Sequence, residues 1–161
     1  MKIFFFTLLI SWTVLAEKPT MLLNEQQMGI DTSSFINDFG DWIASSTLGV
    51  YINGKKILNA DKVGRNTQAY LNNNREWVVA SQSGVYLNGQ RVLRNITLGT
   101  HYNLNLNNRG NWILAGNAFG AYIDGKKVLD KEKVGISVAV GINDQFWIVS
   151  SSAGVFSGNL P

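Results

Sequence analysis

Short apolar stretches separated by polar residues run along most of the chain, without a helical period. From residue 19 onward, these stretches are rich in Val, Ile, Tyr and Trp and are bounded by Asn, Asp and Gly. This pattern is typical of β-strands joined by tight turns. In one part of the chain it predicts four consecutive strands, at 68–72, 76–81, 84–87 and 90–93. Asn88-Gly89, between the last two, is a strong hairpin signal because both residue types tolerate positive φ.

The same arrangement returns about every 35 residues. Its clearest marks are Trp42, Trp77, Trp112 and Trp147, which are spaced by 35 residues. An Asn-containing turn precedes each Trp, and Gly-Val-Tyr or a close variant follows it by seven or eight residues. Self-similarity at such a period indicates a repeat architecture. We place the repeat units at about 32–58, 67–93, 102–129 and 137–158, with 19–23 equivalent to the fourth strand of a unit.

The second strand of each unit is apolar on both faces, as in Trp-Val-Val-Ala at 77–80 and Trp-Ile-Leu-Ala at 112–115. A sheet covered on one face only would alternate apolar and polar residues. Sheets packed between copies of themselves have both faces covered, as in the blades of a β-propeller. The sequence therefore predicts an all-β protein, a four-bladed β-propeller of four-stranded repeats.

The two ends of the repeat region suggest how the ring closes. The chain ends in the third strand of the last unit, at 154–158, and 19–23 is equivalent to a fourth strand. We therefore predict that the N-terminal strand completes the last blade. On this interpretation 17–161 is a single domain, and we expect a monomer.

Residues 1–16 have the pattern of a secretory signal peptide. Lys2 precedes an apolar stretch at 3–10, and Ala16 offers a small residue at a cleavage site. The apolar stretch is shorter than the ~20 residues that span a bilayer. We expect cleavage after Ala16, a secreted or periplasmic location, and no integral membrane segment afterwards.

These recurring motifs resemble those of a known group. The Ile/Leu-Asn-Asp/Asn-x-Gly turn, the Gly-Val-Tyr strand and the late apolar-Gly pair are similar to HAF-type extracellular repeats and related small β-propeller repeat proteins. The resemblance extends over 19–161 and implies a propeller architecture. The chain departs from it by lacking the turn Gly in the second and fourth units and a Leu-Gly-Gly ending.

Composition narrows the possible chemistry. The chain has no Cys and one His, His101, which excludes disulfides and Cys-based zinc sites and disfavours His-based triads. The net charge of +3 is too small and too scattered for a nucleic-acid interface. We therefore predict no catalytic residues, no metal site and no cofactor.

Most conspicuous side chains have a structural explanation. The four Trp share one repeat position inside an apolar strand, which favours packing between blades over stacking against sugars. The Asn and Asp residues at 37–38, 72–74, 107–108 and 143–144 favour turns, because their side chains bond the local backbone. The loops that vary most between units lie on one face of the predicted ring. We place a ligand site there, with Lys62, Arg65, Thr97, His101, Asn117 and Ser151 as candidate binding residues.

These observations favour a non-catalytic binding module whose partner is a glycan or an extracellular or periplasmic protein. A structural or assembly platform is the first alternative. The second is a glycosidase or lyase that uses carboxylates such as Asp31, Asp61 and Asp130. A glycosidase needs two carboxyl groups ~5–10 Å apart at the scissile bond, and nothing in the sequence pairs these three.

Overall fold

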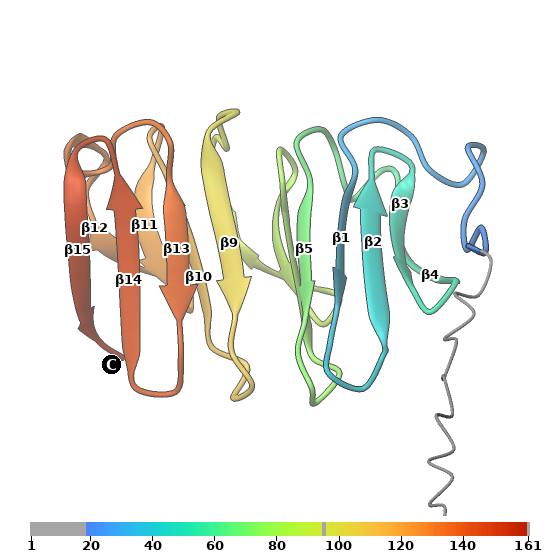
Figure 1. Cartoon of the computed structure of the whole chain (residues 1–161). Coiled ribbons are helices and arrows are strands. Elements are labelled where there is room, and N and C mark those ends of the chain that lie inside the picture. Colours follow the sequence, from blue (N-terminus) through green and yellow to red (C-terminus); the bar gives the residue numbers. More distant parts are fainter. Residues whose placement is uncertain (1–18, 95, 161) are drawn as a thin grey trace, which may run out of the picture.

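The computed structural model describes residues 19–94 and 96–160, so the predicted signal peptide lies outside the described residues. The chain forms antiparallel sheets connected in sequence order (Figure 1). The first sheet contains β1 (Ser33–Ile36), β2 (Trp42–Ser46), β3 (Gly49–Ile52) and β4 (Lys55–Asn59). The second contains β5 (Gln68–Leu71), β6 (Trp77–Ser81), β7 (Gly84–Leu87) and β8 (Gln90–Leu93). These last four strands confirm the predicted ones to within one residue at each end.

The other two sheets continue the pattern. The third contains β9 (Tyr102–Leu106), β10 (Trp112–Gly116), β11 (Gly120–Ile123) and β12 (Lys126–Leu129). A 3-10 turn at Lys131–Lys133 leads to the last sheet, made of β13 (Ala139–Ile142), β14 (Phe146–Ser151) and β15 (Gly154–Asn159). The prediction of an all-β protein built from repeated antiparallel sheets is confirmed.

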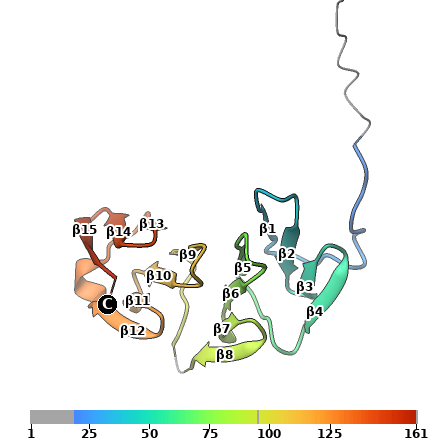
Figure 2. The same ribbon diagram turned by 90° about the horizontal axis from the view of Figure 1, so that it is seen from below.

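The sheets stand side by side and fan out in an open arc (Figure 2). Their first strands are neighbours along the inner side of the arc, β1 beside β5, β5 beside β9, and β9 beside β13. The last strand of each four-stranded sheet lies on the outer side (Figure 2). The first and last sheets form the two ends of the arc.

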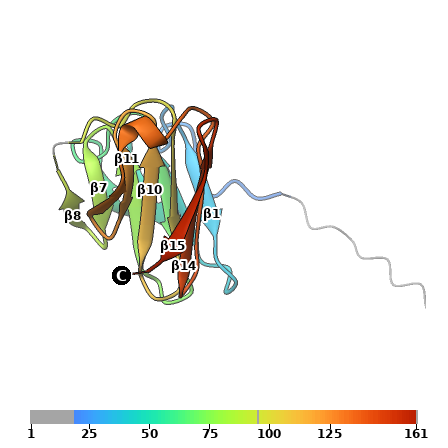
Figure 3. The same ribbon diagram turned by 90° about the vertical axis from the view of Figure 1, so that its left-hand side faces the viewer.

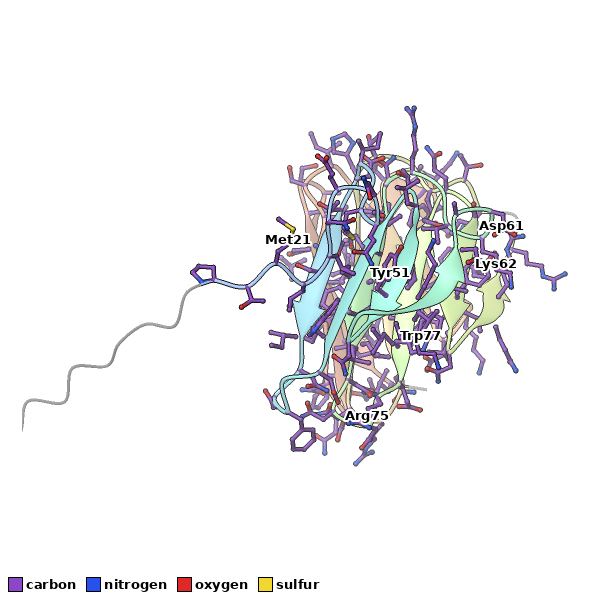
Figure 4. All side chains as sticks on the ribbon, turned by 90° about the vertical axis from the view of Figure 1, so that its right-hand side faces the viewer. Met21, Tyr51, Asp61, Lys62, Arg75 and Trp77 are labelled. Carbon is purple, nitrogen blue, oxygen red and sulfur yellow. The ribbon has the colours of Figure 1, made fainter. Side chains whose placement is uncertain are left out.

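The predicted closure of the ring by the N-terminal strand was wrong. Residues 21–23 lie beside the first sheet, where they share a cavity with Ile36 and Trp42. Figure 4 shows Met21 at this end of the molecule, next to the first sheet. Among the described residues, the last sheet contains β13, β14 and β15 only. The prediction failed because the arc does not turn far enough for the last sheet to meet the first (Figure 2).

The hydrophobic core consists of three layers, each between two neighbouring sheets. Ile43 and Val50 of the first sheet pack with Leu71 and Val79 of the second. The next two layers repeat this contact, with Val78 and Val85 against Leu104 and Trp112, and then Ile113 and Ala121 against Trp147 and Val149. Trp112 and Trp147 are buried, whereas Trp42 and Trp77 are half-buried. The prediction that the Trp residues pack between sheets is thus fully confirmed for Trp112 and Trp147 only.

The turn asparagines confirm the predicted turn chemistry and also connect the sheets. The Oδ1 atom of Asn72 accepts hydrogen bonds from the backbone N–H groups of Asn74 and Glu76, at 3.0 and 2.9 Å. Asn37 and Asn107 bond their own turns in the same way. Their Nδ2 groups reach the next sheet. The donors of Asn37, Asn72 and Asn107 bond the carbonyls of Asn72, Asn107 and Asn143, at 3.0, 3.0 and 2.8 Å. We call this series the Asn ladder.

Candidate functional site

The six residues predicted to bind a ligand lie on four separate segments at one end of the sheets. This end holds the connections between sheets, and the tight Asn turns lie at the other. Figure 4 shows Arg75 at the lower end and Lys62 above it, on the outer side of the molecule. Lys62 and Arg65 lie on the β4–β5 loop, and Thr97 and His101 lie on the β8–β9 loop. Asn117 follows β10, and Ser151 is the last residue of β14. None of the six lines any of five open surface cavities in the described part of the chain.

Several of these six residues stabilise their own loops. Ser151 Oγ accepts hydrogen bonds from the N–H groups of Gly135 and Ala153, at 3.1 and 3.2 Å. The carbonyl oxygens of Arg65 and His101 accept bonds from Gln82 and Asn117 in neighbouring turns. The side chain of Ser151 thus has a structural role, whereas Arg65 and His101 contribute only their backbone carbonyls, and a ligand site at this end stays a prediction.

A more coherent group of side chains lies on the inner strands. Ala69 and Leu71 of β5 are buried in the layer against the first sheet. Because successive residues of a strand point to opposite faces, Gln68 and Tyr70 lie on the other face. Gln68, Tyr70, Ser33 and Asn103 line one cavity along β1, β5 and β9. We call this region the inner cleft.

Two aromatic rings lie side by side on the inner strands. The ring centroids of Phe35 on β1 and Tyr70 on β5 are 5.0 Å apart, and the planes are tilted by 44°. Phe35 is 38% exposed and Tyr70 is half-buried, so part of this pair faces solvent. An exposed pair of this kind offers an apolar surface, and the Tyr hydroxyl adds a polar edge.

The polar side chains beside the rings are held in place by the next inner strand. Gln68 donates from Nε2 to the carbonyl of Tyr102 and accepts from the N–H of Leu104, both at 2.9 Å. Ser33 Oγ accepts from Ala69 N–H at 3.3 Å, and Asn103 Nδ2 donates to the carbonyl of Val138 at 3.4 Å. The inner cleft is therefore built from amide and hydroxyl groups of fixed orientation, with no charged side chain in its lining.

A small cavity next to the inner cleft is lined by Asp31, Asn66 and Tyr102, among others. Tyr102 donates its hydroxyl to the carbonyl oxygens of Asn66 and Ala80. Burial, reinforced by the nearby Asp31 carboxylate, raises the pKa of Tyr102 well above its ordinary value. Tyr102 therefore stays a neutral donor, and its contacts tie the second and third sheets together.

The carboxylates considered for an enzyme have separate contacts. Asp31 Oδ2 accepts a hydrogen bond from Asn66 N–H at 3.1 Å. Asp130, after β12, pairs with Lys127 at 3.1 Å, and the carboxylate raises the pKa of that lysine. Asp61 is exposed on the β4–β5 loop. The two bonded carboxylates belong to different parts of the arc and have unrelated partners.

The described residues contain no cluster of three or more His, Asp or Glu side chains that could hold a metal ion. Over the same ranges, no helix is long and apolar enough to cross a membrane.

Sequence reasoning missed the inner cleft, although a signal for it was present. Phe35, Tyr70 and Asn105 share one repeat position, as do Ser33 and Gln68. The first strands thus alternate between residues that face the preceding sheet and residues that face the next one; Tyr70, of the second kind, lines the cleft and also packs against the core between the second and third sheets. Our prediction weighted loop variation more than this alternation, and so placed the site at the loops.

Comparison with known proteins identifies no relative of this chain. No protein-family model, curated protein or solved structure matches the chain, and the resemblance to HAF-type repeats stays a prediction.

Proposed function

We propose that this chain is a secreted or periplasmic, non-catalytic binding module whose sheets act as propeller blades, and that its ligand is a carbohydrate bound in the inner cleft. The observation that carries this proposal is the half-buried Tyr70 ring, which lines the cleft with the amides of Gln68 and Asn103 and lies against Phe35. Small-ligand sites combine apolar and aromatic surface with a few well-placed polar groups in a concavity. Sugars present apolar C–H faces and hydroxyl groups, which suit rings and amides respectively.

The absence of charge in the cleft lining favours a neutral glycan over an acidic one. An acidic sugar would need an Arg or Lys for bidentate or charge-assisted contacts. The basic side chains of the repeats, such as Lys55, Lys56 and Lys127, instead lie exposed on outer strands.

A glycan array tests the proposal. We expect the mature chain to bind neutral glycans, and Tyr70→Ala to weaken that binding at least tenfold. Phe39→Ala is the matched control, because it also removes an aromatic ring, but from a tight turn outside the inner cleft, where Phe39 is 76% exposed. Binding to no glycan, or equal loss in both variants, would contradict the proposal.

The second candidate is an interaction platform, which is favoured by the uncovered apolar residues on the first and last sheets, such as Ile36 and Ile148. Selective capture of a surface protein by a chain that binds no glycan would favour this function. The glycosidase alternative receives less support, since Asp31 and Asp130 are engaged elsewhere. Turnover of a broad panel of glycosides would revive it.

A further inference from the structure

The two ends of the arc expose faces that are interfaces everywhere else in the molecule. Val78 and Val85 face the third sheet and are 0% exposed. Their equivalents on the last sheet, Ile148 and Val155, are 46% and 67% exposed. Figure 3 shows β14 and β15 at the front of this end. The last sheet thus keeps apolar residues at positions that a following sheet would cover.

The first sheet has the complementary face. Leu71 faces the preceding sheet and is 1% exposed, whereas its equivalent Ile36 is 62% exposed. Ser34, Trp42 and Ala44 complete this face, and none of them is charged. The last sheet and the first sheet therefore present the two halves of one repeating, uncharged interface.

The Asn ladder is open at the same two ends. Asn143 closes its own turn through Oδ1, accepting from Gln145 and Phe146 N–H at 2.8 and 2.7 Å. Its Nδ2 makes no hydrogen bond within residues 19–94 and 96–160. The carbonyl of Asn37 accepts within its own turn only, whereas those of Asn72 and Asn107 also accept from the preceding sheet. One more junction of the same kind would let Nδ2 of Asn143 donate to the carbonyl of Asn37 in a sheet equivalent to the first.

The segment before β1 has the conformation of a connection between two sheets. Gln27 N–H bonds the carbonyl of Asn24 at 3.0 Å, as Lys62 bonds Asn59 at 3.1 Å and Lys133 bonds Asp130 at 3.0 Å. Downstream, Thr47 N–H bonds the carbonyl of Ile30, as Gln82 bonds that of Arg65 and Ser152 that of Ile136. Residues 20–23 therefore lie where the outer strand of a preceding sheet belongs.

The contacts of this segment fit that place. Leu23 lines a cavity with Ile36 and Ala44 of the first sheet. Its equivalent, Leu58, packs in the core with Leu71 and Val79. The rest of the preceding sheet, which would pair with 20–23, is not contributed by the described residues of the same chain.

The last sheet lacks the strand that the N-terminal segment would supply. The other outer strands carry exposed basic residues, which discourage pairing by a further strand: Lys55 and Lys56 on β4, Arg91 on β8, and Lys126 and Lys127 on β12. β15 is the edge of its sheet and has no charged residue at all. An edge of this kind is suited to pairing with another strand.

We propose that a second copy of this chain completes the fold, head to tail. The last sheet of one copy packs on the first sheet of the next, whose residues 20–24 add to β15 as its fourth strand. Val50 pairs with Leu58 inside the first sheet, so the equivalent register places Val155 opposite Leu23 of the second copy. The Asn ladder then continues from Asn143 to Asn37 of that copy.

A head-to-tail contact forms a closed ring when its rotation allows, and two copies make the smallest such ring. The junction between two copies would lack one contact that the junctions within the chain have. Gln68 and Asn103 donate side-chain hydrogen bonds to the next sheet, whereas the equivalent residue of the last sheet is Ala139, which has no polar side chain. The expectation of a monomer depended on closure within one chain, which the structure does not have. Association of this kind is independent of the proposed glycan binding.

A cysteine pair tests the proposal directly, because the chain has no Cys of its own. The variant Leu23→Cys/Val155→Cys of the mature chain is oxidised mildly and analysed by non-reducing electrophoresis and mass spectrometry. We expect disulfide-linked species of two or more copies, which reductant converts to single chains. The control Leu23→Cys/Val92→Cys places the second thiol on the exposed outer strand β8, and we expect at least tenfold less cross-linking.

A disulfide within single chains would show that the N-terminal strand closes its own ring, and would overturn the proposal. Equal cross-linking in both variants, or none in the test variant, would also overturn it. The near-UV circular dichroism spectrum of each reduced variant is compared with that of the wild type, so that the cross-linking is read from folded chains.

Discussion

At the scale of single residues, each of the turn asparagines Asn37, Asn72 and Asn107 closes its own turn through Oδ1 and bonds the next sheet through Nδ2. The spacing of Asn37, Asn72 and Asn107 was visible, and so was their turn chemistry. The bond from each Nδ2 to a carbonyl one repeat away was not predicted. That bond depends on how neighbouring sheets stack, and a local pattern of residues does not contain this information.

The ladder predicts unequal costs for equivalent substitutions. Asn72→Ala removes two turn bonds, a bond to the Glu76 carboxylate and the ladder bond at a residue that is 4% exposed, so we expect a loss of about 2–3 kcal/mol. Asn143→Ala removes turn bonds at an exposed residue, where water replaces them, and we expect about 1 kcal/mol or less. Urea unfolding at low protein concentration measures both. Equal losses would show that the ladder bond contributes nothing.

Tyr102 gives a second test at this scale. Tyr102→Phe leaves the carbonyls of Asn66 and Ala80 without their shared donor, and we expect a loss of about 1–2 kcal/mol in unfolding free energy. Tyr122→Phe is the control, since the described residues include no hydrogen bond to its hydroxyl. A Tyr102→Phe variant as stable as the wild type would contradict the bonding described for the hydroxyl.

At the scale of elements, the sequence predicted much of the structure. The strands of the second sheet were located to within one residue, because Asn-Gly turns and short β-branched runs define them locally. The two-sided burial of the second strand, predicted from its apolar run, is confirmed for β2, β6 and β10 but not for β14, where Ile148 is exposed. The degree of burial of each Trp was not, since it depends on what covers each sheet, and Trp42 and Trp77 stay half-buried.

Burial of the second strand predicts an order among the Trp variants. Trp112 is 2% exposed in the middle of the arc, so Trp112→Ala should cost about 3–5 kcal/mol. Trp77→Ala should cost less, because part of that side chain is already in water. Guanidinium unfolding compares the two. A larger loss for Trp77→Ala would contradict the packing described between the second and third sheets.

At the scale of the whole molecule, the repeat count was predicted and the curvature was not. The rotation from one sheet to the next comes from the packing of residues such as Val78 against Leu104, and it decides how many sheets make a full turn. No local pattern encodes that angle. The candidate site was misplaced for a related reason, since the inner cleft exists only once β1, β5 and β9 are neighbours.

The central claim is that the chain completes its arc with another copy of itself, and the solution mass of the mature chain tests this most directly. We expect sedimentation equilibrium at micromolar concentration to give the mass of at least two chains. Ile148→Asp/Val155→Asp, which places carboxylates on the uncovered face of the last sheet, should sediment as a monomer. A wild-type chain that stays monomeric up to high concentration would contradict the account.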